Sequence, residues 1–125
     1  MSSTDIEALA TALFGAVEAG DLDRIRAMYA PDVVVWHNFD RKSQTLDENM
    51  RVLRWMVANV SERRYEEIRR VVLEDGFVQQ HVLRGVTASG ARLDLPAMMR
   101  VWVAHGHVTR IDEYLDSAQV TSILS

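Results

Sequence analysis

The stretch that decides the fold is RYEEIRRVVLEDGFVQQHVLRGVTASGARLDLPAMMRVWVAHGHVTRIDEYLD, residues 64–116. It contains four long segments rich in valine, leucine and aromatic residues: 64–74, 77–87, 92–103 and 108–116. Three dipeptides typical of tight hairpin turns separate these segments: Asp75-Gly76, Ser89-Gly90 and His105-Gly106. Strands joined by tight turns predict an antiparallel meander.

Two amphipathic helices are predicted near the N-terminus. Apolar residues recur at helical spacing over residues 4–18, where Thr4 is a suitable N-cap and Glu7 completes a capping box. A second, shorter helix is predicted over residues 22–29, with Asp21 as its N-cap.

The remaining elements complete the predicted architecture. Pro31-Asp32 precedes a β-branched run over residues 33–37, which suits a buried strand. Thr45 caps a third helix through Glu48, and residues 118–124 form either a last helix or an edge strand. Helices that precede hairpin-linked strands predict an α+β fold, in which N-terminal helices pack on one side of a curved, mostly antiparallel sheet.

The composition indicates one globular domain over residues 1–125. The chain is 48% hydrophobic and 26% charged, and a domain of this length needs no disulfide or metal to fold. It has no cysteine, which excludes disulfide frameworks and cysteine nucleophiles. With 14 basic and 18 acidic residues, no apolar run long enough for a bilayer and no basic signal region, the chain is expected to be cytoplasmic, with no nucleic-acid and no membrane partner.

Polar residues occur on two of the predicted strands where apolar residues would be cheaper to bury. Side chains alternate along a strand, so Trp36 and Asn38 share one face at the end of the first strand, whereas His37 takes the other face. By the same rule, Arg92 and Asp94 share a face. The alternatives are that Arg92 and Asp94 form an ion pair in solvent, and that Asn38 caps the loop after its strand.

Glu113 is a candidate for an inward-facing carboxyl group. It shares a face with the apolar Ile111 and Leu115. Apolar walls raise the pKa of a carboxyl group, whereas a nearby guanidinium lowers it. An arginine between two carboxyl groups can therefore divide acid and base roles between them. The alternative is that Glu113 is a partly exposed strand residue.

Three further side chains are candidates for binding a substrate. Trp36 and Trp55 could form the wall of an aromatic pocket, or belong to the core. His81 lies on a central strand, where it reaches a cavity or a subunit interface, or is a hydrogen-bonded structural histidine.

The chain resembles the nuclear-transport-factor-2-like superfamily over nearly its whole length. The resemblance is carried by LFGAVEAGDLDRIRAMYAPDVVVW (13–36), by GARLDLP (90–96) and by GHVTRIDEYLD (106–116). The last segment is similar to the ends of SnoaL-like polyketide cyclases, ketosteroid-isomerase-like proteins and limonene-epoxide-hydrolase-like proteins. The resemblance implies a cone-shaped fold with a cavity at its wide end.

The candidate residues also resemble the limonene-epoxide-hydrolase site. Arg92 and Asp94 match that family's Arg-x-Asp pair, Glu113 falls at its second acid, and Asn38 matches its water-holding Asn. By this resemblance Glu113 deprotonates a water oriented by Asn38, Asp94 protonates the epoxide oxygen, and Arg92 bridges the two carboxyl groups. Trp36 falls where that family has a Tyr, and an indole cannot accept a hydrogen bond.

These observations predict a small cofactor-independent enzyme that binds a hydrophobic cyclic metabolite and performs acid–base chemistry, such as epoxide hydrolysis, isomerisation or cyclisation. No histidine pair has the spacing of a helical metal site, and no phosphate loop, dinucleotide fingerprint or nucleophile elbow occurs, so no metal and no cofactor are expected. The alternatives are a non-catalytic small-molecule-binding module and, further behind, a protein-interaction domain.

A homodimer is the expected assembly. Residues 97–103 are apolar on both faces of their predicted strand, and only one face can pack on the helices. A second sheet would cover the other face, with Met and Trp typical of interface cores. The family resemblance implies the same arrangement.

Overall fold

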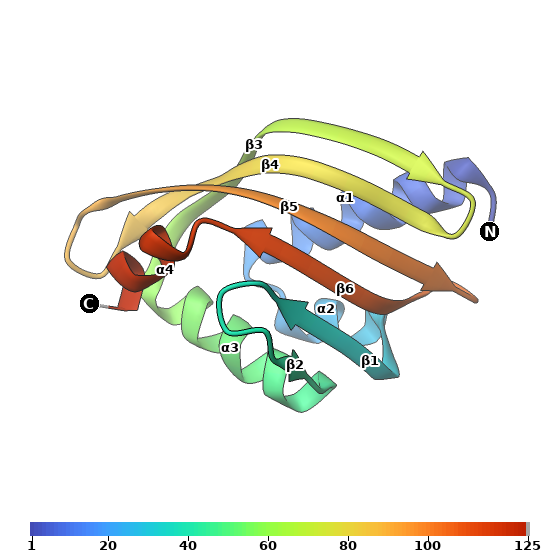
Figure 1. The fold of residues 1–125 in the computed structure, drawn as a ribbon, viewed down its shortest axis with the longest axis horizontal. Coiled ribbons are helices and arrows are strands. Elements are labelled where there is room, and N and C mark those ends of the chain that lie inside the picture. Colours follow the sequence, from blue (N-terminus) through green and yellow to red (C-terminus); the bar gives the residue numbers. More distant parts are fainter. Residues whose placement is uncertain (125) are drawn as a thin grey trace.

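The computed structural model describes residues 1–124, with side chains described through residue 121 (Figure 1). Its elements follow one another in the order α1 (Ser3–Ala19), α2 (Leu22–Met28), β1 (Tyr29–His37), β2 (Ser43–Gln44), α3 (Leu46–Asn59), β3 (Val60–Leu73), β4 (Gly76–Thr87), β5 (Arg92–Ala104), β6 (His107–Leu115) and α4 (Ser117–Leu124). No helix within residues 1–124 is both long and apolar enough to cross a bilayer.

Six strands form one curved sheet in the order β2-β1-β6-β5-β4-β3. The pairs β3–β4, β4–β5 and β5–β6 are antiparallel, so the predicted meander is confirmed. The one parallel pair among the described strands is β1–β6, which places the last strand between the first strand and the meander. The helices α1, α2 and α3 gather on one side of the sheet (Figure 1), which confirms the predicted α+β fold.

Two helix N-termini test the predicted caps. The N-cap of α1 is Ser2, two residues before the predicted cap at Thr4: Ser2 Oγ accepts from the Asp5 N–H at 3.1 Å, and the Asp5 carboxylate accepts from the Ser2 N–H at 3.1 Å. The predicted cap at Thr4 was wrong because Ser2 and Asp5 have the same capping-box spacing two residues upstream. The predicted box of Thr45 and Glu48 at the start of α3 is confirmed.

The first strand is longer than predicted. β1 begins at Tyr29, directly after α2, and runs through Pro31 rather than starting at Val33. The register with β6 shifts between Tyr29 and Val34. Pro31 lacks an N–H and lies in this irregular stretch, so it interrupts the hydrogen-bond ladder without ending the strand.

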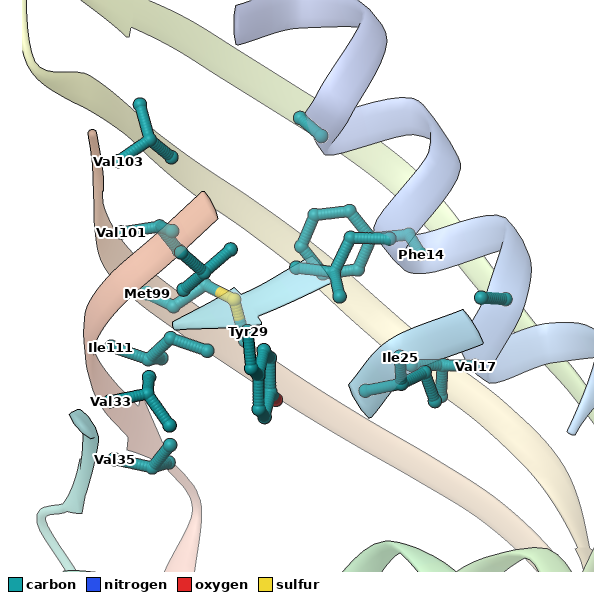
Figure 2. Packing of buried hydrophobic residues seen from close by; sticks show 14 of the residues in the cluster. Phe14, Val17, Ile25, Tyr29, Val33, Val35, Met99, Val101, Val103 and Ile111 are labelled. Atoms are coloured by element: carbon teal, nitrogen blue, oxygen red, sulfur yellow. The ribbon is translucent and has the colours of Figure 1, made fainter. Parts of the chain in front are cut away.

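The core lies between the helices and the inner face of the sheet. Alternate residues of the strands point inward, where they meet α1 and α2. Figure 2 shows the packed side chains, and those from the strands include Tyr29, Val33, Val35, Met99, Val101, Val103 and Ile111. The opposite face, called the outer face below, carries the other set of side chains on every strand.

A buried arginine joins the ends of two helices. Arg63 is 9% exposed and follows Glu62, whose positive φ of 54° marks a bulge in β3. The Arg63 guanidinium donates to four backbone carbonyls, those of Val17, Glu18, Val57 and Val60. The carbonyls at a helix C-terminus have no partner within the helix and attract positive charge, so Arg63 stabilises the C-terminal ends of both α1 and α3.

Candidate functional site

The inner face carries a carboxyl–imidazole pair at the junction of the first and last strands. β1 and β6 place His37 directly beside Glu113, and Nε2 of His37 lies 3.1 Å from Oε1 of Glu113. The His37 side chain is 9% exposed and the Glu113 side chain 19% exposed. Glu113 therefore lies on the inward face, as its apolar neighbours indicated.

The environment of His37 favours its protonated form. Burial lowers the pKa of His37, but the hydrogen bond to Glu113 and the negative charges of Glu113 and Asp40 together outweigh burial and raise that pKa above its usual value. His37 Nδ1 is buried without a hydrogen-bond partner. The pair therefore depends on the Nε2–Glu113 contact to stabilise the imidazole.

Two aromatic rings stand close to the pair. The rings of Tyr65 and His81 meet edge to face, with centroids 4.7 Å apart. Burial, and after it the charge of Glu113, raises the pKa of the Tyr65 hydroxyl. Burial lowers the pKa of His81, the charge of Glu113 opposes this shift, and the charge of Arg70 adds to it. At neutral pH both rings are therefore neutral groups within reach of the Glu113 charge.

The polar atoms of these two rings that concern a ligand are the hydroxyl of Tyr65 and Nε2 of His81. Neither atom makes a hydrogen bond with a residue that the structure describes. Tyr29 differs, because its hydroxyl donates to Asn49 Oδ1 at 3.0 Å. Two hydrogen-bond donors are thus available to a ligand beside Glu113.

Arg92 and Asp94 do not lie with Glu113. Along β5 the side chains that point inward are those of Leu93 and Leu95, so Arg92 and Asp94 point to the outer face. The Asp94 side chain is 66% exposed, and its Oδ1 lies 3.3 Å from Nε of Arg84. The expected pocket with two carboxyl groups bridged by Arg92 is therefore not what the structure contains. The alternative of a solvent-facing ion pair describes Asp94, with Arg84 as its partner in place of Arg92.

Asn38 has a structural contact. Its Nδ2 donates to the Leu115 carbonyl at 3.2 Å, and its Oδ1 accepts from the Leu115 N–H at 2.9 Å. The Asn38 amide thus continues the pairing of β1 with β6 beyond the last residue of β1, and both of its polar atoms are engaged.

The two tryptophans predicted to bind substrate lie away from Glu113. Trp36 points to the outer face, where its ring meets that of Tyr114 edge to face at 5.3 Å. Trp55 is exposed on α3, beside Val52. Of the three predicted substrate-binding residues, only His81 lies on the inner face near Glu113.

Sequence reasoning did not identify Tyr65 as a member of the site, and it set His37 aside because His37 lies on the face opposite Trp36. The signal for His37 was present, because His37 shares a face with Val33 and Val35, which are apolar core residues. Tyr65 has no such signal. Two bulges in β3, at Glu62 and Glu67, shift the alternation on either side of Tyr65, so its face cannot be counted from the sequence.

Metal ligation finds no support in this geometry. Among the residues that the structure describes, no three His, Asp or Glu side chains gather closely enough to hold an ion.

The fold and the site together define a class of protein: a single α+β domain whose helices back a curved, open sheet with titratable side chains on the inner face. The family model of the SnoaL-like domain matches residues 10–111. The chain belongs to this family. No functionally curated protein matches the sequence.

Solved structures share the fold over almost the whole chain. A candidate polyketide cyclase from Xanthomonas campestris is 21% identical, with a TM-score of 0.83 over 99% of this chain and 100% of that one. A candidate polyketide cyclase from Pseudomonas putida is 21% identical, with a TM-score of 0.80 over 98% and 97% of the two chains. AclR, a candidate hydroxylase from Streptomyces galilaeus, is 14% identical, with a TM-score of 0.85 over 98% and 86%. At these identities the likeness establishes the fold.

Proposed function

We propose that this protein is a small enzyme that performs acid–base chemistry on a hydrophobic, cyclic carbonyl compound without a cofactor. The observation that carries the proposal is the inward Glu113 carboxyl group, joined to His37 and flanked by the donors of Tyr65 and His81. Structural neighbours described as candidate cyclases and a hydroxylase support an enzyme rather than a structural protein.

In this mechanism Glu113 is the proton acceptor. It removes a proton from the carbon next to the substrate carbonyl, and the electron pair of that C–H bond moves to the carbonyl oxygen to form an enolate. The Tyr65 hydroxyl and the His81 Nε2–H donate hydrogen bonds to this oxygen, where the negative charge develops. Glu113 then returns the proton to another carbon, which gives an isomer. Alternatively, the enolate carbon attacks a second carbonyl of the substrate, which closes a ring, and Glu113 gives its proton to the alkoxide that this attack forms.

Epoxide hydrolysis is the reaction that the resemblance to limonene epoxide hydrolases favours. It requires an acid that protonates the epoxide oxygen in the same pocket as the base that activates the water. That role would fall to Asp94, which lies on the outer face while Glu113 lies on the inner face. The inner face supports enolate chemistry better than epoxide opening.

A turnover assay tests the proposal. Wild type and Asp94→Asn are offered β,γ-unsaturated cyclic ketones and cyclic epoxides, and binding of each compound is measured in parallel. We expect turnover of a ketone, equal in the two proteins. A fall of about 10²-fold in Asp94→Asn, the scale of general acid catalysis, would return the proton donor to Asp94. Tight binding of ring compounds with no turnover would identify a binding module.

The outer face supports a second proposal, that two copies of the chain pack sheet to sheet. Val71, Met98 and Tyr114 are exposed large apolar side chains on this face, and a groove of about 530 Å³ runs past Met98 and Tyr114. Exposed apolar surface of this kind marks an interface, and Met and Tyr are enriched in interface cores.

The dimer proposal predicts that Met98→Arg makes the protein monomeric, because it places a charge in the middle of the interface. Sedimentation equilibrium at several concentrations measures the change. Val52→Arg is the matched control, since Val52 is equally exposed on α3, away from the outer face. A wild type that sediments as a monomer, or a Met98→Arg protein that still dimerises, would refute this arrangement.

A further inference from the structure

A chain of hydrogen bonds runs from the surface of α1 to His81. Glu7 on α1 accepts from Arg70 Nη1, Arg70 Nε donates to Gln79 Oε1 at 2.7 Å, and Gln79 Nε2 lies 2.8 Å from His81 Nδ1. Gln79 is fully buried, His81 is 4% exposed, and the Arg70 side chain is 10% exposed. The chain ends at a ring that the mechanism above uses, but the mechanism gives no role to Glu7, Arg70 or Gln79.

The chemistry of these groups fixes which atom donates and which atom accepts in each hydrogen bond of the chain. A guanidinium can only donate hydrogen bonds, so the atom of Gln79 that faces Arg70 has to be the amide oxygen. The amide nitrogen then faces His81, and it too can only donate. His81 Nδ1 must accept, which places the single proton of the neutral ring on Nε2.

We infer that Arg70 and Gln79 are positioning residues that keep the proton of His81 on Nε2, so that the site offers a fixed, neutral N–H donor to a carbonyl oxygen of the substrate. This inference rests on the proposed function for the identity of the ligand. The lowered pKa of His81 is consistent with it, because burial and the Arg70 charge both disfavour a second proton on the ring.

The fixed tautomer narrows the class of substrate. A neutral imidazole N–H stabilises the oxygen of an enolate by a hydrogen bond, and an enolate needs no proton on that oxygen before the next step. An opened epoxide leaves an alkoxide, a far stronger base, which must take a proton. The His81 donor therefore suits a cyclic ketone or related carbonyl compound rather than an epoxide.

Nitrogen-15 NMR of the wild-type protein tests the tautomer directly. A long-range proton–nitrogen spectrum at pH 7 distinguishes protonated from unprotonated ring nitrogens. His81 is assigned by its absence in His81→Gln. We expect Nε2 of His81 to be protonated and Nδ1 to be unprotonated. A proton on Nδ1, alone or on both nitrogens, would overturn the inference.

Two variants test the cause. In Gln79→Glu the new carboxylate can accept but not donate, so we expect Nδ1 of His81 to become protonated while the contact with Arg70 is kept as an ion pair. In Glu7→Gln, the matched control, the outer end of the chain changes and the His81 spectrum stays as in wild type. An unprotonated Nδ1 in Gln79→Glu would refute the role of Gln79. Should that variant fail to fold, the wild-type spectrum remains decisive.

The experiments distinguish a failure of the inference about the His81 tautomer from a failure of the proposed function. With Nε2 protonated but no turnover of any ketone, the positioning role stands and the proposed function falls. Turnover of epoxides in preference to ketones would overturn the substrate class while leaving the tautomer intact.

Discussion

Glu113→Gln is expected to lower turnover of a cyclic ketone by about 10²- to 10⁴-fold, the range over which a positioned proton acceptor contributes. The amide cannot accept a proton from carbon, so the first chemical step loses its base. The amide oxygen can still accept the hydrogen bond from His37 Nε2, which lies 3.1 Å from the carboxylate. The fold should therefore survive, and KM should change much less than kcat.

The matched control for this prediction is Asp112→Asn. Asp112 precedes Glu113 on β6, but it points to the outer face, where its Oδ1 lies 2.8 Å from Nε of Arg110. Steady-state kinetics and a urea unfolding curve are measured for both variants. The proposal fails when Glu113→Gln keeps wild-type kcat, or when its loss of activity follows a loss of stability that Asp112→Asn does not show.

Arg63→Met is expected to reduce the free energy of unfolding by about 3 kcal/mol, because hydrogen bonds to a charged group are worth about 1.5–3 kcal/mol and a buried acceptor left without its donor costs about 1–3 kcal/mol. Methionine fills much of the same volume but removes the guanidinium donor from the carbonyls of Val57 and Val60, whereas the Val17 carbonyl keeps the Gly20 N–H at 3.1 Å. Domains of this size are stable by about 5–15 kcal/mol, so the loss is a large fraction of the total.

Arg54→Met makes the same exchange at an exposed position of α3, where arginine and methionine have similar helix propensities. Urea unfolding followed by circular dichroism gives both values. We expect Arg54→Met to lie within about 0.5 kcal/mol of wild type, as surface substitutions usually do. Equal midpoints for Arg63→Met and wild type would show that water replaces the guanidinium at no cost.

The meander could be predicted because its signals are local. His105 and Gly106 both adopt positive φ, 52° and 81°, the conformation that a two-residue hairpin turn with a strand-matching twist requires. At Gly76, with φ 154°, an added Cβ would lie 1.9 Å from the Val101 carbonyl oxygen, so glycine is required at that turn. Each turn is set by residues adjacent in sequence, and alternating apolar residues supply the strands between them.

The site could be predicted only in part, because alternation separates two faces without saying which one is inward. On β5 both faces carry large apolar residues: Leu95 and Val101 point inward, whereas Met98 and Trp102 point outward. The pattern on this strand therefore left the direction of Asp94 open. On β6 the outward set includes the charged Arg110 and Asp112, whereas Glu113 alternates with the apolar Ile111 and Leu115, so its neighbours favoured an inward direction.

The partners of Glu113 depend on strand pairing over long separations in sequence. His37 reaches it through the parallel pairing of β1 with β6, and Tyr65 comes from β3, at the far edge of the sheet. The curvature of the sheet brings that edge back toward Glu113, whose charge acts on Tyr65. Neither the parallel pairing nor the curvature has a signature in a short segment of sequence.

The place of β6 in the sheet, between β1 and β5, has a consequence for how activity arises during folding. A chain that ends before residue 107 would lack β6, which joins β1 to the meander, and with it Glu113, the proposed proton acceptor. Bringing His37 beside Glu113 closes a long loop of chain, which costs more conformational entropy than closing a hairpin. The junction of β1 and β6 is therefore expected to form late in folding. The rate at which catalysis recovers after dilution from denaturant would then measure the insertion of β6 into the sheet. The circular-dichroism signal of the helices would not report this step, because α1, α2 and α3 all precede β6 in the chain.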